Sequence, residues 1–271
     1  MPINIDDVLL RSLLPQVLEL VKRAGKKILE VAEQCIDIDC KIDNTPVTNA
    51  DLAANELIVS ELSHLDSKFP VLSEESTKIP FSQRKLWNTY WLVDPLDGTR
   101  EFINNNGEYS INIALIHEHK AIFGVIYAPV QGVIYYAYKG AGAYKIDGLN
   151  KPEQLHVNDQ KRCPLIIACG NNQPGDEFEE FVKQLGDVAF IAMGSSLKSC
   201  LIADGSADLY ARLGPTSEWD TAAAQCIVEE AGGCLTNLKM QPLTYNTKDS
   251  LLNPHFLVYG DKNEDWGHFF K

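Results

Sequence analysis

Apolar residues recur at every third or fourth position between residues 14 and 32, which is the period of a helix that buries one face. A helix is therefore predicted there, with Pro15 tolerated in its first turn. A second helix is predicted to begin at Thr48 and to continue to Leu62, since Thr48-Asn49-Ala50-Asp51 has the form of a capping box. We expect the chain to start with two core-facing helices.

The pattern changes after residue 90 to runs of β-branched and aromatic residues that are separated by glycine and asparagine, as is typical of strands. These runs predict a mainly antiparallel sheet from residues 90–93, 110–116, 121–128 and 133–138.

Beyond residue 155, short apolar strands alternate with helical stretches, which predicts an α/β layer. The predicted strands are residues 165–168, 188–192, 209–213 and 256–259, and the helices are 177–185 and 197–203. The polar stretch 150–160 is the expected boundary. We therefore expect an N-terminal α+β part, residues 1–155, and a C-terminal α/β part, residues 156–271.

The length of 271 residues and the hydrophobic content of 45% allow a substantial core and exclude a disordered or fibrous chain. The seven cysteines are scattered without a C-x-x-C pair, as expected of reduced thiols, and predict neither a disulfide framework nor a thiolate zinc site. They are Cys35, Cys40, Cys163, Cys169, Cys200, Cys226 and Cys234.

The N-terminus lacks the basic flank and apolar run of a signal peptide, and no apolar stretch reaches the ~18 residues of a membrane span. We expect a cytoplasmic protein, and peripheral contact with the inner face of the cell membrane stays open. A net charge of −13 argues against binding to nucleic-acid polymers. Small anions remain candidate ligands if metal ions intervene, and the oligomeric state is not predicted.

Two carboxylates follow the predicted strand that ends at Val93. Asp94 and Asp97 flank Pro95-Leu96, and Gly98-Thr99 then opens a turn. A strand end that presents two carboxylates and a glycine turn can hold a hard cation and a phosphate.

Further acids occur upstream and downstream of this turn. Glu74 and Glu75 follow another short apolar run, and Asp220 stands at the start of a predicted helix that ends at Gly232-Gly233. Each acid also has an ordinary structural explanation. Asp220 could be a helix-start carboxylate, Asp51 a capping partner, Glu74 and Glu75 a solvated pair, and Asp97-Gly98 a simple turn.

Taken together, these segments resemble the signatures of the inositol monophosphatase superfamily of lithium-sensitive, magnesium-dependent phosphatases. The matching segments run in order from residue 46 to residue 233, and jointly they are very specific. They are Pro46-Val47-Thr48-x-Ala50-Asp51, Ser73-Glu74-Glu75-Ser76, Trp91-Leu92-Val93-Asp94-Pro95-Leu96-Asp97-Gly98-Thr99, Trp219-Asp220-Thr221-Ala222-Ala223 and Glu230-Ala231-Gly232-Gly233. The resemblance implies an α+β fold, the layered αβαβα sandwich of the inositol monophosphatase and fructose bisphosphatase type.

The resemblance also implies two or three Mg²⁺ ions per active site. Glu74, Asp94 and the Leu96 carbonyl would hold one ion, and Asp94, Asp97 and Asp220 a second. The residue types agree independently, because all the proposed ligands are oxygens and none of the six histidines lies in these motifs.

In the mechanism that the resemblance implies, a metal-activated water attacks the phosphorus. Thr99, in contact with Asp51, would polarise the water, and the amides of Gly98 and Thr99 would cradle the phosphate. A rival chemistry forms an aspartyl-phosphate on Asp-x-Asp-Gly-Thr, but here two residues separate the acids. That spacing would turn the second carboxylate to the other side of an extended chain, so direct water attack is favoured.

Four further segments resemble the CysQ type of 3′(2′),5′-bisphosphate nucleotidases within the superfamily. A glycine and serines at a helix start, followed by Lys198, form an anion-binding arrangement suited to a second phosphate. Arg212 falls near a slot where inositol phosphatases carry an acid. Ser195, Lys198 and Arg212 are therefore expected to bind substrate together with Glu74, Leu96, Asp97, Gly98, Thr99 and Asp220. The segments are residues 97–103, 124–129, 194–198 and 252–254.

The implied reaction removes the 3′-phosphate of adenosine 3′,5′-bisphosphate, to give AMP and phosphate, and of 3′-phosphoadenylyl sulfate, which recycles a by-product of sulfate activation. The nearest alternative is an inositol-1-phosphate phosphatase, and a phosphatase of bisphosphorylated sugars is more distant. A catalytically silent, metal-dependent sensor is the alternative of another class. The presence of Asp51, Thr99 and every proposed ligand speaks against it, because a sensor needs no residue to activate water.

Overall fold

The computed structural model describes residues 5–34, 37–40, 46–65, 68–76, 79–171 and 175–270. Within these residues the helices are α1 (Asp7–Ala32), α2 (Asn49–His64), α3 (Phe81–Arg84), α4 (Thr99–Ile103), α5 (Asp176–Leu185), α6 (Leu197–Ala203) and α7 (Glu218–Glu230), with the 3-10 turns η1 (Glu74–Ser76) and η2 (Trp266–Phe270).

A seven-stranded sheet has the order β3-β4-β5-β6-β7-β8-β9 and is antiparallel except for the parallel pair β3 and β4. The mainly antiparallel sheet predicted from the sequence is therefore confirmed. Its strands are β3 (Val71–Ser73), β4 (Thr89–Asp97), β5 (Ser110–His117), β6 (Lys120–Ala128), β7 (Val133–Tyr138), β8 (Ala143–Asp147) and β9 (Glu153–Gln154).

A second, five-stranded sheet has the order β11-β10-β12-β14-β13, with β10 parallel to both of its neighbours and the other pairs antiparallel. Its strands are β10 (Leu165–Cys169), β11 (Val188–Ala192), β12 (Leu209–Arg212), β13 (Cys234–Asn237) and β14 (Phe256–Tyr259). A short pair, β1 (Ile38–Cys40) and β2 (Pro46–Thr48), precedes α2.

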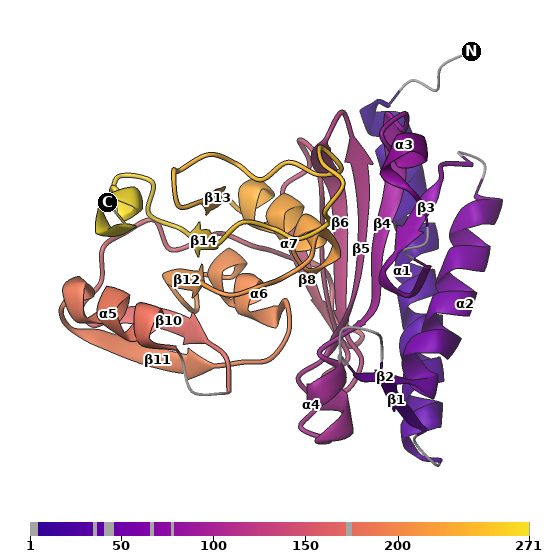
Figure 1. Ribbon diagram of the computed structural model, residues 1–271, viewed down its shortest axis with the longest axis horizontal. Helices are drawn as coiled ribbons and strands as arrows, with labels where there is room; N and C mark the ends of the chain where they lie inside the picture. The colour runs from indigo at the N-terminus through magenta and orange to yellow at the C-terminus, as the bar shows by residue number, and fades with distance from the viewer. Residues whose placement is uncertain are drawn as a thin grey trace.

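The two sheets and the helices form five layers (Figure 1). Helices α1 and α2 cover one face of the seven-stranded sheet, α6 and α7 lie between the sheets, and α5 lies on the outer side of the five-stranded sheet. The expected αβαβα sandwich is confirmed, and each helical layer buries its apolar face against a sheet.

Helix α1 begins earlier than predicted. Asp6 caps it by accepting a hydrogen bond from the Leu9 amide (3.0 Å), and the buried Leu10 and Leu13 extend its apolar stripe. Pro15 therefore lies in the helix interior, not in the first turn, where it removes one backbone donor. The burial of the extended stripe outweighs this local defect.

Helix α7 sits directly on the seven-stranded sheet, against β5, β6 and β7. A Cβ at Gly124 of β6 would lie 2.4 Å from the carbonyl oxygen of Ala223, so only glycine allows this close approach. Because α7 carries Asp220, the same contact sets the distance of that acid from the sheet.

The expectations of reduced cysteines and of no membrane span can be compared with the structure only for the described residues. Cys163, Cys169, Cys200, Cys226 and Cys234 carry free thiols, whereas Cys35 and the side chain of Cys40 lie outside the described residues. None of the described helices combines the length and apolar character of a membrane span.

Candidate active site

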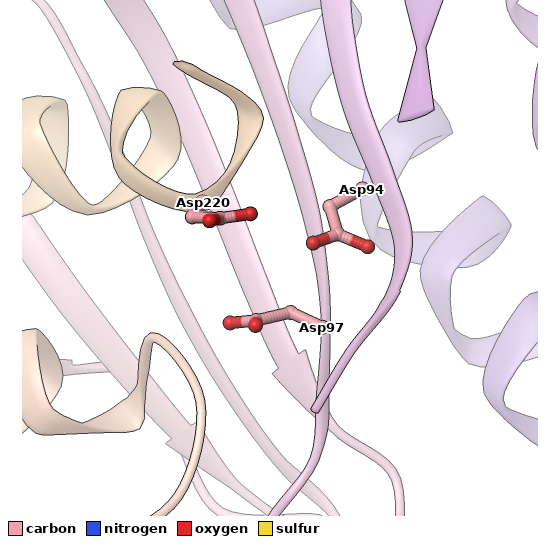
Figure 2. Close-up of side chains that lie close together, drawn as sticks. All are labelled: Asp94, Asp97 and Asp220. Atoms are coloured by element: carbon pink, nitrogen blue, oxygen red, sulfur yellow. The ribbon is translucent and has the colours of Figure 1, made fainter. Parts of the chain in front are cut away.

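Three carboxylates from two elements converge between the sheet and α7. Asp94 and Asp97 come from the end of β4 and Asp220 from the first turn of α7, and one oxygen of each lies within 4.8 Å of the others (Figure 2). In an extended strand, residues three apart face opposite sides. The β4–β5 register shifts between Asp94 and Asp97, however, so both carboxylates reach the same space. The expectation that the spacing turns Asp97 away is therefore wrong.

These acids lie close enough to repel one another, with Asp94 buried and Asp97 and Asp220 half-buried. Burial and then the charges of Glu74, Asp97 and Asp220 raise the pKa of Asp94 well above its usual range, and Asp94 also shares a hydrogen bond with Glu74. Burial and the charge of Asp97 raise the pKa of Asp220 to about 8. Burial also raises the pKa of Asp97, although Lys198 opposes the shift. A cluster of oxygen ligands with unfavourable mutual charge fits a hard divalent cation.

Both acids that could be read as helix-capping residues do cap helices. The Ser217 amide donates to Oδ2 of Asp220 (2.9 Å), which completes a capping box at α7. Thr48 donates from its amide (2.7 Å) and its hydroxyl (2.6 Å) to Oδ2 of Asp51 at α2. The structural explanation and the site assignment are thus compatible, because each carboxylate has a second oxygen.

The second oxygen of Asp51 accepts a hydrogen bond from the Thr99 hydroxyl (3.0 Å). The same hydroxyl lies 3.4 Å from the Leu96 carbonyl, and the Leu96 amide donates to Asp94 (3.1 Å). Burial raises the pKa of Asp51, while its hydrogen bonds with Thr48 and Thr99 oppose the shift. The predicted residues of this half of the site therefore lie in one connected cluster.

Gly98 adopts a left-handed conformation (φ +93°) just before α4, which disfavours any side chain there. The first bond of α4 runs from the Phe102 amide to the Gly98 carbonyl (2.9 Å). The amides of Gly98 and Thr99 therefore precede the helical ladder and have no partner within the helix.

Residues that the sequence analysis missed hold Asp97 in place. Oδ2 of Asp97 accepts from the Ser196 amide (2.5 Å) and from Nδ2 of Asn112 (3.3 Å). Oδ1 of Asn112 in turn accepts from the hydroxyls of Ser196 (2.8 Å) and Ser110 (3.1 Å). A buried asparagine within the apolar run 111–116 of β5 was a signal for this network, because a buried amide requires partners.

The three residues expected to bind a second phosphate surround a cavity of about 210 Å³ beside Asp97 and Asp220. Lys198 is buried, and its Nζ donates to the carbonyls of Ser195 (2.6 Å) and Met193 (3.3 Å). Arg212 donates from Nη2 to the Pro215 carbonyl (2.9 Å), and its buried Nε has no hydrogen-bond partner among the described protein atoms.

An adjoining cavity of about 310 Å³ shares Lys198, Arg212, Glu101 and Tyr210 with the first. The two cavities together leave room for a ligand larger than a phosphate.

A sequence profile described as the inositol monophosphatase family matches residues 9–264. The chain belongs to the inositol monophosphatase family. The family is metal-dependent, in agreement with the acidic cluster at the end of β4. Both the resemblance and the fold predicted from the sequence are therefore confirmed.

Relatives with the same fold include nucleotidases. The 3′(2′),5′-bisphosphate nucleotidase CysQ of Aggregatibacter actinomycetemcomitans is 40% identical over 265 residues, which cover 97% of this chain and 98% of the relative. The crystal structure of CysQ from Bacteroides thetaiotaomicron matches with a TM-score of 0.79 at 40% identity, over 91% of this chain and 96% of that chain. Inositol monophosphatase-II of Staphylococcus aureus, with 2′-AMP bound, matches with a TM-score of 0.72 at 28% identity, over 92% and 89%.

The raised pKa of Asp220 predicts how the metal-free protein responds to pH. A carboxyl whose pKa rises from its ordinary value of 3.8 to about 8 on folding binds its proton more tightly in the folded state. Its stabilising effect is complete below the lower value and is lost as the pH rises towards the higher one. We expect the thermal midpoint of the chelator-treated protein to fall by about 3 °C or more between about pH 5.5 and about pH 8.5.

The matched control for this pH experiment is Asp220→Asn, which should reduce the slope because one of the titrating carboxyls of the cluster is gone. An added divalent cation should restore the midpoint at the higher pH, since a cation then replaces the proton. A midpoint of the metal-free protein that rises with pH would contradict the expected repulsion.

Proposed function

We propose that this protein hydrolyses the 3′-phosphate of adenosine 3′,5′-bisphosphate in a Mg²⁺-dependent reaction, giving AMP and phosphate. We propose 3′-phosphoadenylyl sulfate as a second substrate. The observation that carries the proposal is the near-full-length identity of about 40% to relatives named 3′(2′),5′-bisphosphate nucleotidase. The acidic cluster beside a cavity with two cationic side chains supports it.

Oxygen ligands from both parts of the chain would hold the metal. In the proposed assignment Glu74, Asp94 and the Leu96 carbonyl bind one Mg²⁺, and Asp94, Asp97 and Asp220 bind a second. Mg²⁺ bound there would polarise the phosphoryl oxygens and lower the pKa of the attacking water. Residues 1–155 would then supply most of the ligands, and residues 156–271 would contribute Asp220 and complete the substrate site.

Thr99 and Asp51 orient and deprotonate the attacking water in this proposal. The Thr99 hydroxyl donates to Asp51, so its lone pairs are left to accept a hydrogen bond from water. As the water loses its proton to Thr99, the Thr99 proton can pass to Asp51, because burial raises the pKa of that carboxylate and so favours proton uptake. The amides of Gly98 and Thr99 would receive the oxygens of the transferred phosphoryl group.

The second phosphate would lie in the cavity beside Asp97 and Asp220. Lys198 uses two of its three N–H donors on backbone carbonyls, which leaves one donor of the ammonium group for an anion. Arg212 adds a second charge with an unused Nε–H, and the Ser195 hydroxyl lies at the same cavity. An inositol monophosphate has no second phosphate to use these groups.

The test compares phosphate release by the Mg²⁺-loaded protein from adenosine 3′,5′-bisphosphate, inositol-1-phosphate and a bisphosphorylated sugar at equal concentrations. We expect the nucleotide to have the highest kcat/KM. A preference for inositol-1-phosphate would overturn the nucleotidase proposal. A protein that binds Mg²⁺ but hydrolyses none of the esters would instead be the silent sensor.

Arg212→Ala is expected to raise the KM for adenosine 3′,5′-bisphosphate about 10- to 100-fold, because a hydrogen bond to a charged group contributes about 1.5–3 kcal/mol. The KM for 3′-AMP, which lacks the second phosphate, should change little. Steady-state kinetics with both substrates measure the difference. Arg11→Ala, which removes an exposed charge from α1, is the control for net charge. Equal losses on both substrates would show that Arg212 does not read the second phosphate.

A further inference from the structure

A short segment near the end of the chain runs alongside the residues that start α7. Residues 251–253, which we call the brace, bond through their backbone to residues 216–218. The contacts are the Glu218 amide with the Leu251 carbonyl (2.8 Å), an antiparallel bridge between Ser217 and Leu252, and the Asn253 amide with the Thr216 carbonyl (2.9 Å). The brace therefore fixes the chain just before Asp220.

The side chain of Asn253 then spans the first turn of α7. Its Nδ2 donates to the Ser217 carbonyl (2.6 Å) and to the Thr221 hydroxyl (3.0 Å). These acceptors lie on either side of Asp220 in the sequence, and the Ser217 amide itself donates to the Asp220 carboxylate (2.9 Å). One amide group thus holds both ends of the turn that presents the acid.

The chain just before the brace is hydrogen-bonded to α3, the short helix that precedes β4 of the seven-stranded sheet. Nη1 of Arg84 in α3 donates to Oδ1 of Asn246 (2.5 Å), and Nδ2 of Asn246 donates to the Arg84 carbonyl (2.7 Å). Both residues are buried. The Asn246 amide also donates to the carboxylate of Glu218 (2.7 Å). Helix α3 directly precedes β4, so these contacts link the strand that carries Asp94 to the helix that carries Asp220.

We propose that Asn253 is a positioning residue for the metal site, acting through the first turn of α7. The inference rests on the proposed role of Asp220 as a metal ligand. Asp220 alone comes from α7, whereas Asp94 and Asp97 share β4, so its distance from them depends on how firmly that turn is held. Groups that orient a metal ligand typically change metal affinity or activity by about 10- to 100-fold when they are removed.

The test measures Mn²⁺ binding by electron paramagnetic resonance in the absence of substrate. Asn253→Ala is expected to raise the Mn²⁺ dissociation constant about tenfold. Asn237→Ala is the matched control, because that asparagine also holds a turn of the second sheet, and its side-chain oxygen accepts from the amides of Lys239 (2.9 Å) and Gln241 (3.1 Å) instead of contacting the first turn of α7 by a described hydrogen bond. Both variants should lose some thermal stability, but only Asn253→Ala should lose Mn²⁺ affinity.

Two substitutions at Thr221 test the same hydrogen bond between Asn253 and Thr221 by changing its acceptor. Thr221→Val removes the oxygen that accepts from Asn253 and should weaken Mn²⁺ binding, while Thr221→Ser keeps the oxygen and should restore it. Unchanged Mn²⁺ affinity in Asn253→Ala and Thr221→Val would overturn the proposal, as would equal weakening in Asn237→Ala.

This outcome is independent of the substrate. If the wild-type protein bound Mn²⁺ but failed to release phosphate from adenosine 3′,5′-bisphosphate, the proposed function would fail while the role of the brace could still stand.

Discussion

Asp94→Asn is expected to lower kcat for adenosine 3′,5′-bisphosphate by about 10⁴-fold, since it weakens both proposed cation sites and removes several kcal/mol of charge stabilisation in the transition state. Asp94 is buried and feels the charges of Glu74, Asp97 and Asp220. In the metal-free protein, removing one charge from this group should relieve repulsion. The variant should therefore combine a higher thermal midpoint without metal with weaker Mn²⁺ binding.

The matched control is Asp147→Asn, which changes an exposed aspartate at the end of β8. Its kcat, Mn²⁺ affinity and thermal midpoint should stay close to those of the wild type. If Asp94→Asn abolished Mn²⁺ binding and left the cellular function intact, the protein would not act as an enzyme. Turnover within tenfold of the wild type would exclude Asp94 as a shared ligand.

Thr99→Val should lower kcat by about 10²- to 10⁴-fold, the usual contribution of a group that moves a proton in the transition state. Valine has nearly the shape of threonine but cannot donate to Asp51 or accept from water. Mn²⁺ binding should persist, because the Thr99 side chain is not among the proposed ligands. Pre-steady-state phosphate release would locate the loss in the chemical step.

Thr99→Ser is the control for this substitution, since it keeps the hydroxyl and should retain most of the activity. A Thr99→Val variant with nearly normal kcat would refute the assigned proton route from Thr99 to Asp51. A loss of Mn²⁺ affinity equal to that of Asp94→Asn would instead indicate that valine disturbs the ligands.

Local patterns in the sequence were enough to predict most of the fold. The capping box at Thr48 and the apolar runs of β4 to β7 depend on neighbouring residues, and the structure confirms them. The start of α1 could not be read because Pro15 is a strong local signal against a helix interior. Tertiary burial of Leu10 and Leu13 overrides that signal. Strands β8, β9 and β13 are short and were not predicted.

The order of the matching segments in the sequence identified the acids of the site, but it could not predict how their carboxylates are oriented. The register shift in β4 depends on pairing with β5, so the sequence spacing of Asp94 and Asp97 suggested the opposite orientation. Asn112 and Asn253 act through contacts with residues far away in the chain. The polar residue in an apolar run marked Asn112, and the resemblance marked the segment of Asn253, but neither pattern could name the partners. Lys198 was expected to face the substrate. Its hydrogen bonds to two backbone carbonyls could not be predicted, because they depend on the conformation of the loop before α6.

Asp51 and Asp220 each cap a helix and also belong to the proposed site, which complicates the interpretation of loss-of-function variants at these positions. At Asp51 and Asp220, asparagine can still accept the helix-start hydrogen bond through its oxygen while it brings an NH₂ group towards the site. Alanine removes the charge and the cap together. Comparing the Asn and Ala variants at each position thus separates the folding role of the carboxylate from its chemical role. A protein that uses one side chain for both has little freedom to change either without the other.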